Sequence, residues 1–540
     1  MKRVTLTALS IGLMPLLGYG QLPPLNVAEG TWMMHHGAAS LRGLQRLRGA
    51  ITGPYVKCYA SFGTAEGDPI VADINGDGLN EIVIAGWDQL VIYAFRGTDC
   101  SLLWSRTLSS SSGPYSGGFS SAVGELDPTR PGLEIAVTAN LTNYLYVLSG
   151  IDGSILWSAP LGDVVWNPPA IADIDGDGIG EIFVSSNYTT YAFRGNGTLL
   201  WSYPAGHNFS NVAVGDLGND GTLEVVFVGW DGSSWSWQVF ALRATNGNFV
   251  WSYPISSTGN VALADLDNDG QLEVVVVYYG GGVIALRHNG SLYWQRTFSC
   301  TADNMNSPTI ADLNGDGLRE ILVGCYNQLT VYALRGTDGS TLWSYSNAAA
   351  HSQNSSRKIG DIDGDGALEV VLTSYHTGFH ACSFTNPCPY HLIVLDGATG
   401  TVEWTWNNPV GIGFEGLAIA DVDNDGCMEI VVGPNSATGG STFYVLDSPT
   451  PVSGCGILGD DEELKVEEER NIGGVYLLVS PVKGGVNVET GRKAFVEIYT
   501  PDGRKVKGLE VDRSAFVELK KGTYIFRVNG HNLYRTVIVR

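Results

Sequence analysis

A nine-residue pattern of oxygen-bearing side chains and glycines recurs along this chain and constrains its fold more than any other feature. The first copy is Asp73-Ile74-Asn75-Gly76-Asp77-Gly78-Leu79-Asn80-Glu81, with oxygen donors at positions 1, 3, 5 and 9. Ca²⁺ takes about six to eight oxygen ligands, and an EF-hand would place its last glutamate at position 12 between two helices. Here β-branched apolar runs flank the loop instead. The pattern therefore predicts a calcium loop between two strands.

The pattern occurs eight times, and its first positions lie 43 to 60 residues apart. The fourth copy has Gly218 at position 3, and the second copy (Glu125, Asp127, Glu134) is interrupted by an insertion, so these two are weaker candidates for calcium. We expect about six to seven Ca²⁺ ions. The predicted metal ligands are Asp73, Asn75, Asp77, Glu81, Asp173, Asp175, Asp177, Glu181, Asp216, Asp220, Glu224, Asp265, Asp267, Asp269, Glu273, Asp312, Asn314, Asp316, Glu320, Asp361, Asp363, Asp365, Glu369, Asp421, Asp423, Asp425 and Glu429.

Each repeat unit contains four short apolar segments, which we name strands A to D. Strand A enters the loop, strand B leaves it, strand C follows a turn, and strand D carries a tryptophan. Four strands in a unit of this length are typical of a propeller blade. We therefore predict an all-β, eight-bladed β-propeller at residues 51–453. The tryptophans are expected to pack between neighbouring blades, as aromatic side chains usually pack in cores. They are Trp104, Trp157, Trp201, Trp251, Trp294, Trp343 and Trp404.

The eighth unit lacks a strand D of its own, because Ser448-Pro449-Thr450-Pro451 follows its strand C. The segment from Thr52 to Tyr59 aligns with the strand D of the seventh unit. We expect this N-terminal strand to complete the eighth blade and close the ring, since closure pairs strands that would otherwise be exposed edges.

Strand direction predicts two rims, one with the A–B calcium loops and one with the B–C turns and D–A connections. Five aromatic residues stand six positions after the loop glutamate, where strand B reaches the second rim: Trp87, Trp230, Tyr279, Tyr326 and Tyr375. They suit either packing between blades or stacking on sugar rings, and core packing is the commoner role of aromatic residues.

The N-terminus has the features of a secretory signal: a basic start, an apolar run up to Leu17 and small residues ending at Gly20. We expect a signal peptide at 1–20, a lead-in at 21–50 and no transmembrane segment. The formal net charge is −24, and about half of the 55 acidic residues stand in the loops. The remaining acidity argues against a nucleic-acid partner, which requires basic surfaces.

With these loops, residues 30–447 resemble the FG-GAP/VCBS repeat family of extracellular β-propellers, which includes the integrin α-chain head. The Gly-x-x-x-Trp strands are also similar to the outer strands of quinoprotein propellers. The resemblance implies calcium in the Asp-x-[Asp/Asn]-x-Asp-Gly-x-x-Glu loops and a role at the cell exterior.

Residues 454–471 form an acidic linker, and residues 472–540 contain alternating strand patterns that predict a small C-terminal β-sandwich. The run from Leu519 to Val528 and the ending Arg535–Arg540 resemble the sorting domain of the bacterial type IX secretion system. Ser480-Pro481-Val482 stands where that family has Pro-Asn-Pro. The resemblance implies secretion machinery as a partner and attachment at the bacterial outer surface; an ordinary spacer domain is the alternative.

The eight cysteines suit an exported protein, and the rim assignment suggests the pairs Cys58–Cys100, Cys300–Cys325, Cys382–Cys388 and Cys427–Cys455 among 105 connectivities. A B–C insertion in the seventh unit carries His376, His380 and His391. These histidines suit either a transition-metal site or a solvated loop, and their spacing matches no zinc pattern.

Three classes of function remain open. The first is a secreted or cell-surface, calcium-stabilised module that binds or adheres to a glycan or an extracellular protein. The second is an enzyme, either a polysaccharide lyase or a quinoprotein dehydrogenase, although the chain lacks a Gly-x-Ser-x-Gly motif. The third is a structural component of a surface layer.

Overall fold

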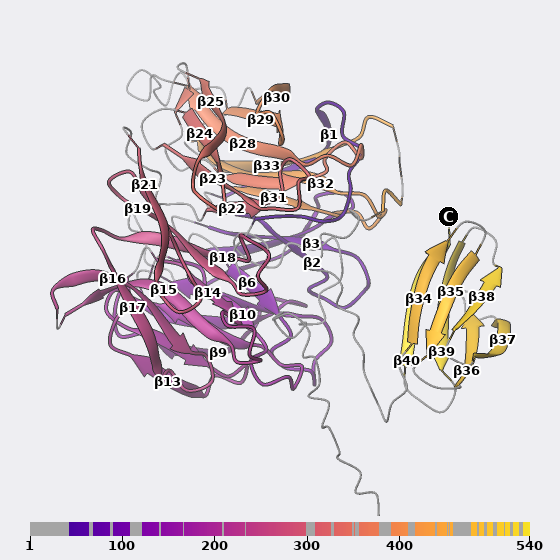
Figure 1. Cartoon of the computed structure of the whole chain (residues 1–540), viewed down its shortest axis with the longest axis horizontal. Helices are drawn as coiled ribbons and strands as arrows, with labels where there is room; N and C mark the ends of the chain where they lie inside the picture. Colours follow the sequence, from indigo (N-terminus) through magenta and orange to yellow (C-terminus); the bar gives the residue numbers. More distant parts are fainter. Residues whose placement is uncertain are drawn as a thin grey trace, which may run out of the picture. The chain divides into compact units, whose positions relative to one another are not determined.

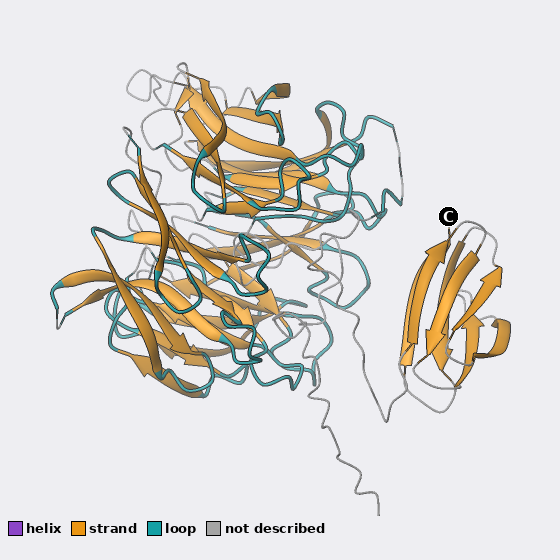
Figure 2. Ribbon diagram, viewed as in Figure 1, coloured by secondary structure: helices purple, strands orange, loops and turns teal. Residues whose placement is uncertain are grey.

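The computed structural model divides into two compact units, Met1–Leu458 and Gly459–Arg540. Every regular element among the described residues is a strand (Figure 2), and none of them forms a helix with the length and hydropathy of a membrane span. The structure describes residues 43–63, 68–86, 90–108, 121–139, 142–165, 167–207, 210–232, 234–298, 308–325, 329–347, 350–351, 356–376, 390–408, 416–437, 440–450, 452, 454–456, 477–482, 485–490, 494–499, 505–511, 514–518, 522–528 and 533–539.

The first unit is an eight-bladed β-propeller whose blades are antiparallel sheets in the predicted order A to D (Figure 1). Blades one to four contain β2 (Ile70–Ala72), β3 (Glu81–Ala85), β4 (Val91–Arg96), β5 (Leu102–Thr107); β6 (Ser121–Gly124), β7 (Glu134–Ala139), β8 (Tyr144–Ser149), β9 (Ile155–Pro160); β10 (Ala170–Ala172), β11 (Glu181–Ser185), β12 (Thr190–Phe193), β13 (Leu199–Tyr203); and β14 (Val212–Gly215), β15 (Glu224–Asp231), β16 (Ser236–Arg243), β17 (Phe249–Ile255).

Blades five to eight continue the same order, with one short additional strand, β26, beside β28 in blade seven. They contain β18 (Gly259–Ala264), β19 (Glu273–Tyr278), β20 (Gly282–Leu286), β21 (Leu292–Thr297); β22 (Thr309–Ala311), β23 (Glu320–Gly324), β24 (Leu329–Arg335), β25 (Thr341–Asn347); β26 (Ala350–His351), β27 (Arg357–Gly360), β28 (Glu369–His376), β29 (Tyr390–Asp396), β30 (Val402–Asn408); and β31 (Leu417–Ala420), β32 (Glu429–Ala437), β33 (Gly440–Asp447).

The burial of each strand follows its position in the blade. Strands A and B are apolar, β-branched and almost wholly buried, as in β18 and β19. Strand D alternates between exposed and covered residues, as in β21. The apolar cores run between adjacent blades, because each sheet packs its faces against its two neighbours.

The strand D tryptophans pack on the following blade, as predicted. At six junctions the indole N–H donates to a carbonyl in the next blade's C–D turn, at 2.6–2.9 Å. The indole also covers a glycine with positive φ in that turn; an added Cβ there would lie 2.5–2.8 Å from the ring. The tryptophan–glycine pairs are Trp104–Gly153, Trp157–Gly197, Trp201–Gly247, Trp251–Gly290, Trp294–Gly339 and Trp343–Gly400.

The N-terminal strand β1 (Tyr55–Phe62) pairs antiparallel with β33, so the eighth sheet has the order β1-β33-β32-β31. Before β1, the lead-in forms two parallel bridges, Leu44 with Ile359 of β27 and Gly49 with Met428 beside β32. Ile51 is fully buried between these blades. Two of the predicted disulfides, Cys58–Cys100 and Cys427–Cys455, are confirmed.

The other two predicted cysteine pairs, Cys300–Cys325 and Cys382–Cys388, include residues outside the described parts of the chain. Cys325 is disulfide-bonded. Cys300, Cys382 and Cys388 lie outside the described residues, as do the predicted signal peptide, the aromatic residues Trp87 and Tyr326, and most of the seventh-blade insertion.

The second unit contains two antiparallel sheets, with strand orders β34-β35-β38 and β37-β36-β39-β40. Val496 and Ile498 of β36 are buried. The strands are β34 (Leu477–Val482), β35 (Gly485–Thr490), β36 (Ala494–Tyr499), β37 (Lys505–Val511), β38 (Ser514–Glu518), β39 (Gly522–Val528) and β40 (Leu533–Val539).

The tryptophan contact predicts the cost of truncating one indole. Trp294 is 8% exposed and donates to Gly336 at 2.6 Å, so Trp294→Ala should lower the free energy of unfolding by about 3–5 kcal/mol. Leu292→Ala in the same strand is the control, because Leu292 is exposed and should change stability by less than about 0.5 kcal/mol. Urea denaturation measures both; equal effects would contradict the assigned packing role.

Candidate metal centres

The glutamate that ends the pattern, at position 9 or, in the interrupted second copy, at position 10, has the same hydrogen bond in all eight loops. Its Oε2 accepts the backbone N–H of the apolar residue at position 2, at 2.6–3.2 Å. The glutamate begins strand B in a buried position, and this bond holds the loop against its own hairpin. The donor–acceptor pairs are Ile74–Glu81, Leu126–Glu134, Ile174–Glu181, Leu217–Glu224, Leu266–Glu273, Leu313–Glu320, Ile362–Glu369 and Val422–Glu429.

The aspartate at position 1 organises the loop backbone. In blade five, Asp265 Oδ1 accepts the N–H of Asp269 at 3.1 Å, and its Oδ2 accepts the N–H of Gly270 at 2.9 Å. Asp269 at position 5 in turn accepts the N–H of Gln271 at 2.8 Å. Gly270 has φ of 84°, a conformation that glycine adopts at little cost. These bonds preform a loop whose carboxylates converge before any ion binds.

Four loops bring three carboxylates together so that one oxygen from each lies within 4.8 Å of the others. All four have aspartate at position 3. The clusters are Asp173, Asp175 and Glu181; Asp265, Asp267 and Asp269; Asp361, Asp363 and Glu369; and Asp421, Asp423 and Asp425.

The donor set of these clusters fits a hard cation such as Ca²⁺. Among the described residues, four buried carboxylate oxygens without a hydrogen-bond partner belong to the eight loops: Asp267 Oδ1, Asp423 Oδ1 and Glu429 Oε1 in intact loops, and Glu125 Oε1 in the interrupted one. A buried carboxylate oxygen without a partner is costly, and a bound cation would satisfy it.

The remaining loops differ at position 3. Asn75 donates from its Nδ2 to Asp77 and Glu81 at 3.1 and 3.0 Å, and Asn314 makes the equivalent bonds at 3.0 and 3.4 Å. Both asparagines therefore lie among the predicted ligands. Gly218 leaves blade four without a position 3 side chain.

The interrupted second copy keeps the glutamate hydrogen bond but does not gather three carboxylates. Glu134 accepts the N–H groups of Leu126 and Asp127 at 2.9 and 3.0 Å. Asp127 instead pairs with Arg130 at 3.0 Å in the insertion.

Basic side chains that sequence reasoning missed lie against the loops. In blade five, Arg287 Nη1 is 2.7 Å from Asp267, 3.5 Å from Asp269 and 3.2 Å from Glu273. Arg194 and Arg243 contact the loops of blades three and four. The available signal was an arginine that ends or directly follows strand C in five units: Arg96, Arg194, Arg243, Arg287 and Arg335.

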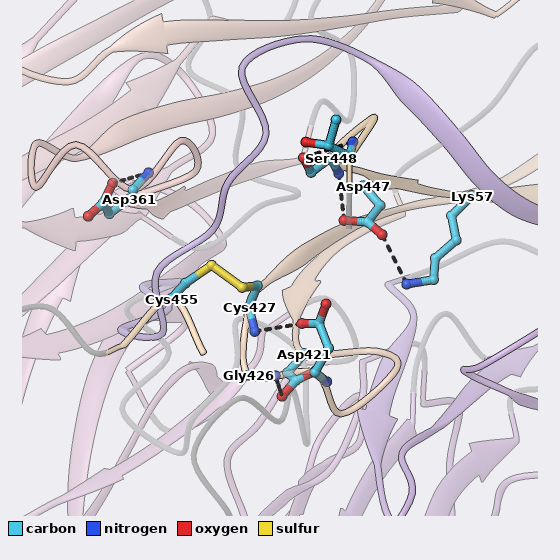
Figure 3. The surroundings of a disulfide bond; sticks show 11 residues. Lys57, Asp361, Asp421, Gly426, Cys427, Asp447, Ser448 and Cys455 are labelled. Atoms are coloured by element: carbon cyan, nitrogen blue, oxygen red, sulfur yellow. Dashed lines mark hydrogen bonds and ion pairs between the residues drawn. A yellow bond between two sulfur atoms is a disulfide. The ribbon is translucent and has the colours of Figure 1, made fainter. Parts of the chain in front are cut away.

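Blades seven and eight have aspartate at this strand C position, Asp396 and Asp447. Their loops contact cations from the N-terminal segment instead. Arg48 Nε lies 3.0 Å from Asp361 of blade seven. Lys57 lies 2.9 Å from Asp447 of blade eight (Figure 3). It also contacts Asp423 of the same blade. The N-terminal segment thus compensates charge in the two blades that have aspartate at this position.

The electrostatics of the loops reflect this crowding of buried acids. Burial raises the pKa of Glu81, Glu181, Glu273 and Glu320 to about 7, with a smaller contribution from the negative charge of neighbouring aspartates. The pKa of Glu369 and of Glu429 rises to about 9, again chiefly through burial. For Lys57, burial opposes protonation, but Asp423 and Asp447 outweigh it and raise its pKa.

The opposite rim presents exposed aromatic residues at the B–C turns of four consecutive blades. Tyr144 is 36% exposed, Tyr188 58%, Trp235 78% and Tyr279 52%. Only Tyr279 was in the predicted set. The predicted set used a fixed spacing after the loop glutamate. Tyr144, Tyr188 and Trp235 do not have that spacing, because they stand at or just before strand C.

Trp230, a second member of the predicted set, is half-buried and packs within its own hairpin. Its ring lies 5.3 Å from Trp237 and 6.5 Å from Trp235, both edge-on. The ring of His207 lies 4.5 Å from that of Trp237, and burial lowers the pKa of this histidine to about 4. The side chains of Tyr375, His376 and His391, and residue His380, lie outside the described parts of the chain, so the possible histidine site is untested.

Comparison with known proteins agrees with this architecture. The model of the FG-GAP-like repeat matches residues 173–227, 265–323 and 312–372. These segments cover the loops of blades three to seven. No curated protein sequence matches the chain.

Solved structures share the fold at low sequence identity. Quinohemoprotein alcohol dehydrogenases from Pseudomonas putida HK5 and Comamonas testosteroni each have 12% identity and a TM-score of 0.54; the first alignment covers 78% of this chain and the second 79%, and each covers 82% of the enzyme. A europium-containing methanol dehydrogenase has 13% identity and a TM-score of 0.50, with 78% and 99% of the two chains covered. The chain therefore carries FG-GAP-like repeats, set in an eight-bladed β-propeller.

Proposed function

We propose that this protein is a calcium-stabilised binding module of the cell exterior, whose ligand is a glycan held on the aromatic rim. The observation that carries the proposal is the run of exposed aromatics, Tyr144, Tyr188, Trp235 and Tyr279, on one rim of four successive blades. Exposed aromatic groups that lie close together mark binding surfaces more often than scattered single residues do.

The surroundings of Trp235 suit a polyhydroxylated ligand. Gln238 Nε2 donates to Asp231 at 3.1 Å and to Ser234 at 2.9 Å, and the hydroxyls of Ser234 and Ser236 are 2.6 Å apart. An aromatic face beside a carboxylate, an amide and hydroxyls offers both stacking and hydrogen bonding. The net charge of −24 favours a neutral glycan over an anionic one.

Calcium would stiffen the opposite rim. The preformed loops, the converging carboxylates and the buried oxygens without partners support Ca²⁺ as the bound ion. We assign it to the six intact loops, with blade four as a weaker site.

An exterior location fits the sequence features. The disulfides Cys58–Cys100 and Cys427–Cys455 suit an oxidising compartment. We assign residues 1–20 to a secretory signal. We also infer that the second unit is a small β-sandwich that acts as an export and surface-attachment domain, on the strength of its resemblance to sorting domains.

We further infer that β1 closes the propeller ring. Besides its pairing with β33, the inference is supported by contacts between blade one and the last two blades. Asp68 of blade one accepts the N–H of Leu417 at 3.2 Å and forms a buried ion pair with Lys358 at 2.8 Å. Asn80 donates to Asp421 O at 2.6 Å.

Removing one ligand should remove one ion. Asp267→Ala should lower the number of bound Ca²⁺ by one, because Asp267 Oδ1 is a buried ligand oxygen without another partner. The control is Asp127→Ala in the interrupted loop, which should leave the number unchanged. Isothermal titration calorimetry on chelator-treated protein measures both. An unchanged stoichiometry for Asp267→Ala would contradict the assignment of a calcium site to the loop of blade five.

The raised pKa values predict how stability without calcium depends on pH. A folded-state pKa above the unfolded value of 4.5 means that the folded protein retains protons that the unfolded chain releases. In EGTA the melting temperature should therefore fall as pH rises from 4.5 through about 7, and further towards 9 because of Glu369 and Glu429.

The same experiment has an internal control. Excess Ca²⁺ should raise the melting temperature at pH 8 by several degrees, because the ion binds only the folded state. Glu369→Gln keeps an oxygen that can accept the Ile362 N–H, and should melt higher than wild type in EGTA at pH 8. A melting temperature that rises with pH in EGTA would contradict the buried-acid account.

Truncating the exposed tryptophan should weaken ligand binding. Trp235→Ala should reduce the affinity for the best glycan found on a glycan array by about tenfold or more, since central aromatic anchors dominate such interfaces. Phe249→Ala on the outer strand β17 is the matched control, because Phe249 is also exposed. A parallel protein array tests the alternative: binding to proteins alone would overturn the glycan assignment.

A further inference from the structure

Two of the eight blade junctions lack the tryptophan–glycine contact found at the other six, and at one of them, between blades eight and one, a disulfide occupies its place. At six junctions a strand D tryptophan covers a positive-φ glycine of the next C–D turn. Between blades eight and one, the outer strand is β1 and the turn belongs to blade one. Cys58 of β1 is bonded there to Cys100.

The two cysteines stand at the positions of the tryptophan and the glycine. Cys58 lies opposite Val445, with a bulge before it, as Trp404 lies opposite Val394. Trp343 has the same relation to Ala333. The register of β1 therefore equates Cys58 with the blade tryptophans.

Cys100 corresponds to the glycine by conformation and by hydrogen bonding. Its φ is 59°, against 68° for Gly339. Its N–H donates to Arg96 O at 2.9 Å, as Gly339 N–H donates to Arg335 O at 2.8 Å. A side chain at this glycine position would clash with an indole, as at Gly339, where an added Cβ would lie 2.6 Å from Trp294. Tryptophan and cysteine are thus alternatives: the turn accepts either an indole over glycine or a bonded pair of cysteines.

We propose that Cys58–Cys100 is a redox latch that replaces the tryptophan contact at the ring's closing junction, so that reduction loosens this junction first. The proposal rests on the ring closure inferred above. To form the latch, the two thiols lose two protons and two electrons to a small disulfide oxidant, which leaves as two thiols. A dithiol reverses the exchange and leaves β1 held by β33 and by side-chain contacts alone.

The latch differs from the second disulfide in what it joins. Cys427–Cys455 connects the loop of blade eight to the segment after it, which already forms backbone bonds from Gly454 to Asp425 and from Cys455 to Gly426. That disulfide crosses no blade junction. It therefore serves as a control with the same chemistry at another place.

Hydrogen–deuterium exchange of the full-length protein tests the latch. In Cys58→Ser/Cys100→Ser, the amides of β1 should exchange at least about tenfold faster, while those of β19 in blade five stay unchanged. Cys427→Ser/Cys455→Ser should leave β1 unchanged. In Cys58→Trp/Cys100→Gly, which installs the contact of the other junctions, β1 exchange should return to within about threefold of wild type.

The possible outcomes test the disulfide latch and the ring closure separately. Rapid β1 exchange in oxidised wild type would overturn the closure itself. Protected β1 in both wild type and Cys58→Ser/Cys100→Ser would overturn the latch alone. If the serine variant does not fold, dithiothreitol added to folded wild type should speed β1 exchange but should have no such effect on Cys58→Trp/Cys100→Gly. A tryptophan–glycine variant that fails to fold or stays as loose as the serine variant would refute the equivalence.

Discussion

Each blade depends on one buried hydrogen bond, from the backbone N–H at loop position 2 to the glutamate that ends the pattern. The bond occurs in all eight loops, even in blade two, where the metal pattern is interrupted. Its glutamate begins strand B inside the blade, so the carboxylate that shapes the hairpin must tolerate burial. Burial raises the pKa of these glutamates, and a neighbouring cation, whether an ion, arginine or lysine, relieves that cost.

This constraint explains why basic side chains lie against several of the loops. In blade five this side chain is Arg287, directly after strand C. In blades seven and eight the strand C residue is aspartate, and Arg48 and Lys57 come from the N-terminal segment instead. Blades three to five thus use an arginine of their own, and the last two blades use a segment that precedes the first blade.

Much of the architecture was predictable because it repeats. The period of the loops indicated eight four-stranded blades, and the spacing from glycine to tryptophan indicated packing on the next blade. Features that occur once were harder to predict. Lys57 and Arg48 contact loops more than 300 residues away. Trp235 is exposed because it lies in the turn of a hairpin with long strands, β15 and β16. No local pattern encodes contacts between segments that lie so far apart in the sequence.

The position of the first disulfide has a consequence for assembly during synthesis. Cys58 and Cys100 are 42 residues apart, so both leave the ribosome long before β33 exists. Once bonded, they hold β1 beside blade one, with the edge that later pairs with β33 still unpaired. The first fifth of the protein thus offers a template on which the last blade, arriving some 380 residues after β1, can add its strands in a fixed register.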